Sequence, residues 1–373
     1  MKNKGIIIFA VFLGLILCIG VYLLTKNEET AKENTKITGI YNESELFSSR
    51  DLKQTADTSS AVSYTVKSDE DITITTEGVY VITGTASNTT IYVEAASDDK
   101  VQIVLNGVSI TNTNFPCIYV KSGDKVFITI SDDSTLAVTD TFIKDGSTKT
   151  DGVIFSRSDI TLNGTATLTI NSTDNGVVSK DDLKVTGGTY NITATSKGLQ
   201  ANDSFAMSDG EINIKSNDDG IHAENSDDDK LGYVYIGGGI INLDVVDDGI
   251  HAVSVVQVDD GEINITAGEG IEGTYIQING GNINIDATYD GVNAANKSES
   301  YNALFEMNNG TLTIKVDEGD TDAIDSNGDI TINGGTIDIT ASLPFDYVGE
   351  ATLNGGKIII NGNEVSEIPA STK

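Results

Sequence analysis

The chain of 373 residues has no tryptophan, three prolines, two cysteines and two histidines. Cys18 lies in an N-terminal hydrophobic run, so the rest of the chain has only Cys117 and cannot form an internal disulfide. We expect Cys117 to be a small buried side chain. Basic residues are also few, at 23 against 56 acidic ones, and the formal net charge is −33. Such a charge excludes nucleic acid and an anionic membrane surface as partners and favours cations.

Glycine, in contrast, is abundant at 38 residues, and it recurs in a pattern. From about Ile160 to Gly356 the chain repeats a glycine turn, an apolar-polar-apolar triplet, a short gap and a second glycine before a small residue. Three copies are Gly210-Glu-Ile-Asn-Ile with Asp219-Gly-Ile-His-Ala, Gly239-Ile-Ile-Asn-Leu with Asp248-Gly-Ile-His-Ala, and Gly281-Asn-Ile-Asn-Ile with Asp290-Gly-Val-Asn-Ala. A repeat of roughly 20 to 30 residues with no room for a helix predicts a solenoid of stacked β coils.

Aligned in columns, the repeats predict three short strands per coil. Ile, Leu and Val alternate with polar residues, so the apolar columns point inward. A column of small residues also points inward, formed by Ser179, Ala201, Ala223, Ala252, Gly273, Ala294 and Ser326. We attribute the glycines between strands to the unusual backbone angles of tight turns. Roughly ten to twelve coils, stacked at about 4.8 Å, would make a tube on the order of 50 Å long.

The N-terminal part lacks this repeat. Lys2 and Lys4 precede an uncharged run, Gly5 to Leu24, which is long enough to span a bilayer as a helix. The basic flank predicts that the N-terminus stays inside and the remaining chain lies outside the cell membrane. A cleaved signal or a lipoprotein modified at Cys18 is the alternative. We therefore predict a membrane anchor or signal over 1–25, a flexible polar stalk over 26–60, and a β-solenoid over 61–373 whose less regular coils, 61–125, cap the N-terminal end.

One column expected to face outward is acidic and is the first candidate site. Acids stacked at about 5 Å repel one another, and a multivalent cation with oxygen ligands, such as Ca²⁺, would relieve this repulsion. A solvated acidic face is the alternative. The candidate ligands are Asp218, Asp219, Asp247, Asp248, Glu269, Asp290 and Asp322.

Three further outward features are weaker candidates. The two histidines, His222 and His251, occupy the same position in consecutive repeats, which suggests either a transition-metal site or random variation of an exposed position. The middle of the second strand carries asparagine in several coils, which predicts a packing ladder of amides or a strip that binds sugar hydroxyls. Among the tyrosines, Tyr235 and Tyr289 are the candidates for stacking on a sugar ring.

Segments throughout the chain resemble a family of secreted clostridial-type carbohydrate-binding β-helix proteins. The most specific segments are Gly78-Val-Tyr-Val-Ile-Thr-Gly, Val104-Leu-Asn-Gly-Val-Ser-Ile, Asp151-Gly-Val-Ile-Phe-Ser-Arg-Ser-Asp and Asn175-Gly-Val-Val-Ser-Lys-Asp-Asp-Leu. The resemblance implies a right-handed, single-stranded parallel β-helix like that of pectate lyases, with bound calcium and affinity for cellulose-type and acidic pectin-type polysaccharides. It implies calcium at Asp219, Asp248 and Asp290, but Asn175 and Lys197 replace the acid in two coils.

The charge, the repeat and the resemblance together favour a non-catalytic, monomeric, cell-surface or secreted protein that binds polysaccharide, with calcium on its acidic turns. A calcium-dependent lyase needs a basic residue beside the ion, yet the only arginines are Arg50, in the expected stalk, and Arg157, away from the acid-rich coils. A hydrolase with paired carboxylates and a structural adhesin whose partner is a protein are also compatible with the sequence.

Overall fold

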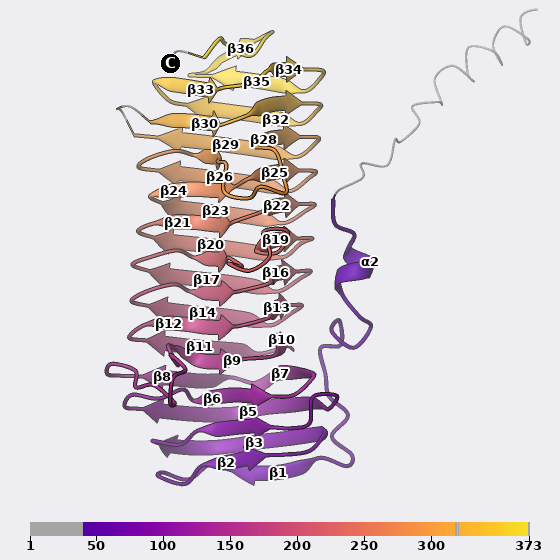
Figure 1. Ribbon diagram of the computed structural model, residues 1–373, viewed down its shortest axis with the longest axis vertical. Helices are drawn as coiled ribbons and strands as arrows, with labels where there is room; N and C mark the ends of the chain where they lie inside the picture. Colours follow the sequence, from indigo (N-terminus) through magenta and orange to yellow (C-terminus); the bar gives the residue numbers. More distant parts are fainter. Residues whose placement is uncertain (1–39, 318, 320, 372–373) are drawn as a thin grey trace, which may run out of the picture. The chain divides into compact units, whose positions relative to one another are not determined.

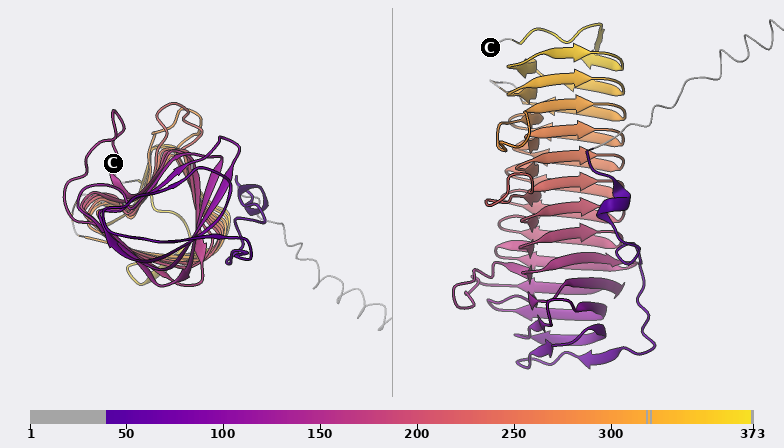
Figure 2. Two further views of the ribbon diagram at one scale, coloured as in Figure 1. Left: turned by 90° about the horizontal axis from the view of Figure 1, so that it is seen from below. Right: turned by 45° about the vertical axis from the view of Figure 1, so that its right-hand side comes forward.

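The computed structural model describes residues 40–371 apart from 318 and 320. From β1 (Val62–Thr65) onward the chain winds into a parallel β-helix (Figure 1). Viewed end-on in Figure 2, the coils superimpose into one tube. The first and second strands of the coils belong to a 24-stranded sheet, and the third strands form a separate 12-stranded sheet. The all-β, parallel β-helix expectation is confirmed, while its right-handed sense stays a prediction.

Each face of the tube is formed by one strand from every coil. The first strands are β7 (Lys125–Asp132), β10 (Asp159–Gly164), β13 (Asp182–Val185), β16 (Ser204–Met207), β19 (Tyr233–Ile236), β22 (Val255–Val258), β25 (Tyr275–Ile278), β28 (Leu304–Met307), β31 (Asp329–Ile332) and β34 (Ala351–Leu353). The second strands are β8 (Ser134–Val138), β11 (Thr167–Ser172), β14 (Thr189–Ala194), β17 (Glu211–Ser216), β20 (Ile240–Val245), β23 (Glu262–Ala267), β26 (Asn282–Ala287), β29 (Thr311–Val316), β32 (Thr336–Thr340) and β35 (Lys357–Ile360). The third strands are β2 (Ile72–Ile74), β4 (Ile91–Glu94), β6 (Ile118–Ser122), β9 (Gly152–Ser156), β12 (Asn175–Ser179), β15 (Leu199–Ala201), β18 (Ile221–Ala223), β21 (Asp248–Ala252), β24 (Glu269–Gly273), β27 (Val292–Ala294), β30 (Asp322–Ser326) and β33 (Leu343–Tyr347).

The two ends of the tube depart from this pattern. Near the N-terminal end, β1 (Val62–Thr65) pairs with β3 (Gly78–Ser87), and β3 and β5 (Lys100–Asn112) are long enough to run across two faces. At the other end, β36 (Asn363–Val365) turns back and pairs antiparallel with β35. This hairpin covers one edge of an otherwise open stack of strands, which is where a β-helix would offer unpaired backbone groups.

The inward columns are those that the sequence predicts. Ile212, Ile241 and Ile263 pair in register on consecutive second strands, and each is fully buried. Cys117 is likewise buried within the core. Because each coil packs only on its neighbours, the apolar core continues along the tube without a size limit.

The glycines that open the third strands have a different role from the one expected. Gly270 and its counterparts do not adopt positive φ, unlike turn glycines such as Gly239, at 90°. Instead, a Cβ atom on Gly270 would lie 2.2 Å from the carbonyl oxygen of Gly291 in the next coil. The same close contact, at 2.6 to 2.8 Å, recurs at Gly176, Gly198, Gly220, Gly249 and Gly291. Here glycine is required by the close approach of two backbones.

Residues 41–54 do not form the flexible stalk that we expected over 26–60. This segment, which we call the strap, includes the short helix α2 (Glu43–Leu46) and lies along the outer surface of the first strands (Figure 1). The Asp51 carboxylate is buried and contacts Lys125 Nζ at 2.7 Å, and Thr161 Oγ1 donates a hydrogen bond to it at 2.7 Å. Phe47 is buried against Tyr235. A few contacts, those of Asp51 and Phe47 among them, hold this mostly polar segment against the β-helix. Its composition alone does not indicate that it is held in place.

The predicted anchor over 1–25 and the part of the stalk before residue 40 lie outside the described residues. Within the described part, no helix is long and apolar enough to cross a membrane.

Candidate functional site

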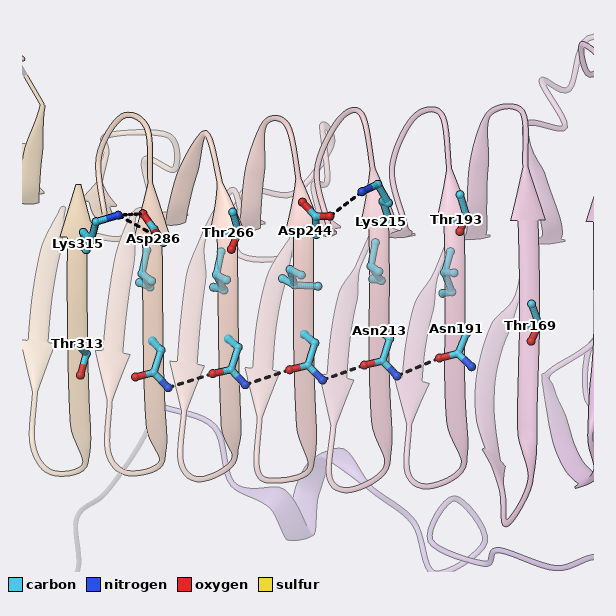
Figure 3. Close-up of a pocket in the computed structure, with 18 residues that line it drawn as sticks. Thr169, Asn191, Thr193, Asn213, Lys215, Asp244, Thr266, Asp286, Thr313 and Lys315 are labelled. Carbon is cyan, nitrogen blue, oxygen red and sulfur yellow. Dashed lines mark hydrogen bonds and ion pairs between the residues drawn. The ribbon is translucent and has the colours of Figure 1, made fainter. Parts of the chain in front are cut away.

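An open groove of about 680 Å³ runs along the second strands from β11 to β29 (Figure 3). It crosses six inter-strand spacings of about 4.8 Å and is therefore roughly 29 Å long. Two outward rows of side chains line it, because residues two apart on a strand point to the same side. Between the rows the strand backbones form the floor.

The first row is a ladder of asparagine amides, which we call the amide ladder. Its members are Asn191, Asn213, Asn242, Asn264 and Asn284, paired in register on consecutive strands. From Asn213 onward, each Nδ2 donates a hydrogen bond to the Oδ1 of the preceding asparagine at 2.8 to 3.0 Å. The packing ladder expected from the sequence is thus confirmed. An amide has two N–H donors and two lone pairs, so a rung keeps hydrogen-bonding capacity beyond its ladder bonds, although Asn213 also donates to Glu211.

The second row carries charges that neutralise one another. Lys215 Nζ contacts Asp244 Oδ2 at 2.7 Å, and Lys315 Nζ contacts both oxygens of Asp286 at 2.9 Å. Thr193 and Thr266 complete this row, whereas Thr169 and Thr313 lie at the two ends of the first row. The two ion pairs leave the groove without net charge on a protein whose net charge is −33. This row was not predicted from the sequence, although the residues of each ion pair occupy the same position in consecutive coils.

A second amide ladder lies outside the groove. It follows the turns after the first strands, where Asn308 donates to Asn279 at 2.9 Å, Asn333 to Asn308 at 2.8 Å and Asn354 to Asn333 at 2.8 Å. None of these four residues lines the groove. This second ladder was not predicted from the sequence, although its signal is visible as Asn before glycine in Asn279-Gly, Asn333-Gly and Asn354-Gly.

The acidic column expected to face solvent is partly buried and already has cationic partners. Asp219 is 3% exposed, and its Oδ2 lies 2.6 Å from both Lys197 Nζ and His222 Nδ1. Burial would raise the pKa of Asp219, but the hydrogen bonds from His222 and Lys197 outweigh it and hold that pKa well below its usual range. The repulsion between stacked acids is therefore relieved here by side chains of the chain itself.

The same principle operates one coil further along. His251 Nδ1 lies 2.7 Å from Asp248 Oδ2 and 2.9 Å from Glu272 Oε2, and Lys297 Nζ contacts Glu272 at 2.8 Å. Burial lowers the pKa of His251, but hydrogen bonds to the two carboxylates outweigh burial and raise it to about 9. The imidazole rings of His222 and His251 stack with centroids 4.6 Å apart. The histidines are thus held by carboxylates and are not exposed positions of random drift.

Three groups in the described residues bring potential metal ligands within 4.8 Å of one another. They are Asp219 with His222 and His251, Asp248 with His251 and Glu272, and Asp218 with Asp219 and Asp247. Of the other predicted ligands, Glu269 accepts a hydrogen bond from Asn293 at 3.1 Å, and Asp290 accepts one from the backbone N–H of Asp322 at 2.8 Å. The structure does not bring Glu269, Asp290 or Asp322 into any of these groups. Burial and nearby acids raise the pKa of Glu269 to about 7.

The two tyrosine candidates have opposite surroundings. Tyr235 is 1% exposed beneath the strap, and its hydroxyl donates to Asp259 at 3.0 Å. It cannot stack on a sugar in this arrangement, so that prediction is wrong. Tyr289 is 62% exposed but does not line the groove. It stays a prediction.

The fold and the groove define a β-helical protein that presents an extended hydrogen-bonding surface. A model of the carbohydrate-binding domain-containing protein family matches residues 68–316 and 268–366. The chain belongs to this family, and carbohydrate is therefore the class of ligand.

Two relatives agree with this assignment. A carbohydrate-binding domain-containing protein of Acetivibrio thermocellus is 42% identical over 206 residues, which are 54% of this chain and 72% of that protein. A polysaccharide lyase-like protein from C. thermocellum, solved as a gadolinium derivative, is 31% identical with a TM-score of 0.50 and covers 60% of this chain and 93% of its own. The β-helix is thus of a polysaccharide lyase-like type.

Proposed function

We propose that this protein binds an extended, uncharged polysaccharide along the amide ladder without cleaving it. The observation that supports this most is the groove itself, in which amide rungs recur on the consecutive second strands from β14 to β26 beside a row that contains two ion pairs. A chain of linked sugar rings also repeats its hydroxyls along its length. Amides can both donate to and accept from hydroxyls, so successive rungs offer equivalent contacts to successive sugars.

The charge distribution supports an uncharged, cellulose-like chain over an acidic, pectin-like one. The groove is neutral because Lys215 and Lys315 are each paired with an aspartate, while the whole chain carries −33. A polyuronate would approach against this field unless cations bridged it. The groove also has no aromatic ring, which favours hydrogen bonding to single chains over stacking on a flat crystalline face.

The cationic side chains near these sites favour binding over lyase chemistry. A lyase base must be unprotonated. Hydrogen bonds to Asp286 raise the pKa of Lys315, and burial lowers that of Lys197, but hydrogen bonds to Asp218 and Asp219 outweigh it. Arg50 lies in the strap over the Phe127 ring, and Arg157 is exposed away from the groove. A hydrolase uses a pair of carboxyl groups as acid and base, and the two carboxylates that line the groove, Asp244 and Asp286, are each engaged by a lysine.

In affinity electrophoresis without calcium, we expect a soluble β-glucan in the gel to retard the full chain more strongly than polygalacturonate does. Incubation with either polymer should release neither reducing ends nor unsaturated products. Stronger retardation by polygalacturonate in the presence of chelator would contradict the proposal that the ligand is uncharged. Unsaturated oligogalacturonides would identify a lyase, and new reducing ends without unsaturation a hydrolase.

We further propose that Ca²⁺ binds at the group formed by Asp218, Asp219 and Asp247. Oxygen ligands suit this ion, and the related C. thermocellum structure was solved with gadolinium, another hard cation. Burial and the nearby Asp219 and Asp218 carboxylates raise the pKa of Asp247, which is the crowding that a cation relieves. The ion would compete with Lys197, whose Nζ lies 2.9 Å from Asp218 Oδ1.

Calcium is expected to raise the thermal midpoint of the protein and chelator to reverse the rise. At a calcium concentration about a hundred times the dissociation constant, binding would add roughly 2.7 kcal/mol to the free energy of unfolding. The variant Asp247→Asn should lose most of the shift, whereas Asp227→Asn, which removes an exposed acid outside the group, should keep it. An unchanged midpoint with calcium, or equal shifts in both variants, would refute the site.

The N-terminal run over 1–25 supports a proposal on location. We propose that it anchors a monomeric protein in the cell membrane with the β-helix outside, where polysaccharides are accessible; cell fractionation tests this location.

A further inference from the structure

A second feature suited to sugars lies on another face, in the N-terminal coils. Tyr92 on β4, Tyr119 on β6 and Phe155 on β9 follow one another in register as an outward column of the third-strand sheet. Tyr119 and Phe155 are buried although they point away from the core, whereas Tyr92 and the neighbouring Phe115 are only half-buried. The column therefore ends at two aromatic rings that are partly accessible.

Beside these two rings lies a pocket of about 500 Å³. Tyr92, Phe115 and Ile143 provide apolar walls, and Asp71, Asn88 and Asn114 provide polar groups. A volume of this size falls within the range of small-molecule sites, which combine apolar walls with a few polar groups. The pocket belongs to coils that precede β11, so it is separate from the groove along the amide ladder.

The aromatic walls are held in fixed positions. The ring centroids of Tyr92 and Phe115 are 6.3 Å apart with planes at 45°, and Tyr119 packs behind both at 5.8 and 5.9 Å. Lys121 Nζ lies 4.7 Å from the centroid of the Tyr92 ring. Such cation–π and aromatic contacts limit ring motion.

The polar side of the pocket is also ordered. Asn112 is 2% exposed, and its Nδ2 donates to the carbonyl oxygens of Phe115 and Pro116 at 3.2 and 3.1 Å, which fixes the turn that carries Phe115. Asp71 Oδ1 accepts the backbone N–H of Thr90 at 2.8 Å, and this bond holds the carboxylate at the pocket. The pocket is therefore preformed and needs little ordering to receive a ligand.

We propose that this pocket is a second carbohydrate site, which takes a single sugar ring or the end of a glycan. A pyranose has an apolar C–H face that fits an aromatic wall, and hydroxyls at its edge that fit carboxylate and amide oxygens. The groove along the amide ladder offers contacts to hydroxyls but no aromatic wall. The pocket therefore adds contact with the apolar face of a sugar, which the groove does not provide. Two sites on one rigid tube would also strengthen attachment to a polymer by raising the local concentration of ligand.

The pocket is tested by titrating the full chain with methyl β-glucoside, methyl β-galactoside and galacturonic acid. Saturation-transfer NMR measures the binding of each sugar. We expect saturable binding of at least one of these probes. Tyr92→Ala should weaken it roughly tenfold, which is about 1.4 kcal/mol, because the variant removes an aromatic wall of the pocket. Tyr92→Phe, which keeps the ring, should retain binding.

Two further variants keep the test independent of folding and of the groove. Ile143 is 52% exposed, so Ile143→Trp should fill the pocket and abolish binding while the thermal midpoint stays unchanged. The double variant Asn242→Ala/Asn264→Ala alters only the amide ladder and should bind these probes normally, even if polysaccharide binding is lost. The proposal is overturned if no probe binds saturably, if Ile143→Trp binds undiminished, or if the ladder variant loses the probes.

Discussion

Removing two neighbouring rungs of the amide ladder, with Asn242→Ala and Asn264→Ala together, is expected to weaken polysaccharide binding by roughly 10- to 100-fold. Each lost amide removes hydrogen bonds worth about 1 kcal/mol apiece to the ligand. The change also deprives Asn213 and Asn284 of the partners that orient their amides. The measurement is the dissociation constant for a soluble β-glucan, by calorimetry or affinity electrophoresis.

The second amide ladder supplies a matched control. Asn308→Ala with Asn333→Ala removes two rungs joined by a bond of 2.8 Å, similar to those in the groove, but on turns that do not line it. We expect this variant to bind polysaccharide as the unmodified chain does, with a comparable change in stability. Equal affinities for the two double variants would show that the amide ladder of the groove is a packing device only.

The variant Gly270→Ala is expected to destabilise the β-helix by about 3 kcal/mol or more, because it overpacks a site with no free volume. The new Cβ would lie 2.2 Å from the Gly291 carbonyl oxygen and 2.5 Å from Ile285 Cγ2. The first of these is backbone of the next coil, so relief requires the coils to separate. Urea denaturation followed by circular dichroism measures the loss.

Gly273→Ala is the matched control on the same strand. Its Cβ would meet Val256 Cγ2 at 3.2 Å and Ile276 Cγ1 at 3.4 Å, which are side-chain atoms that can shift. Ala294 is its neighbour in register, so the column already accepts a methyl group. We expect a change within about 1 kcal/mol, since alanine also loses less conformational entropy than glycine on folding. Equal destabilisation by both variants would disprove the close-approach explanation for Gly270.

The acidic column is the feature whose surroundings differ most from those that the sequence predicts. Its pattern predicts that Asp219 and Asp248 face solvent and need a metal ion. In the structure Lys197 forms an ion pair with Asp219, His222 lies within hydrogen-bonding distance of the same carboxylate, and His251 contacts Asp248. These partners lie in the same columns or one coil away, and their residue types were visible, but the distances between side chains depend on the rotamers that the stacked coils allow.

Periodicity alone was sufficient to predict the repeat, the inward columns and the amide ladder. Local alternation is sufficient for these features because each coil contacts only its neighbours. The solvent exposure of an outward column, in contrast, depends on which distant segments of the chain pack against it. The strap buries Tyr235 and bonds Tyr41 to Gln257, which is 216 residues away. Such contacts join segments with no common period, so burial of an outward residue depends on a long-range partner that periodicity does not identify.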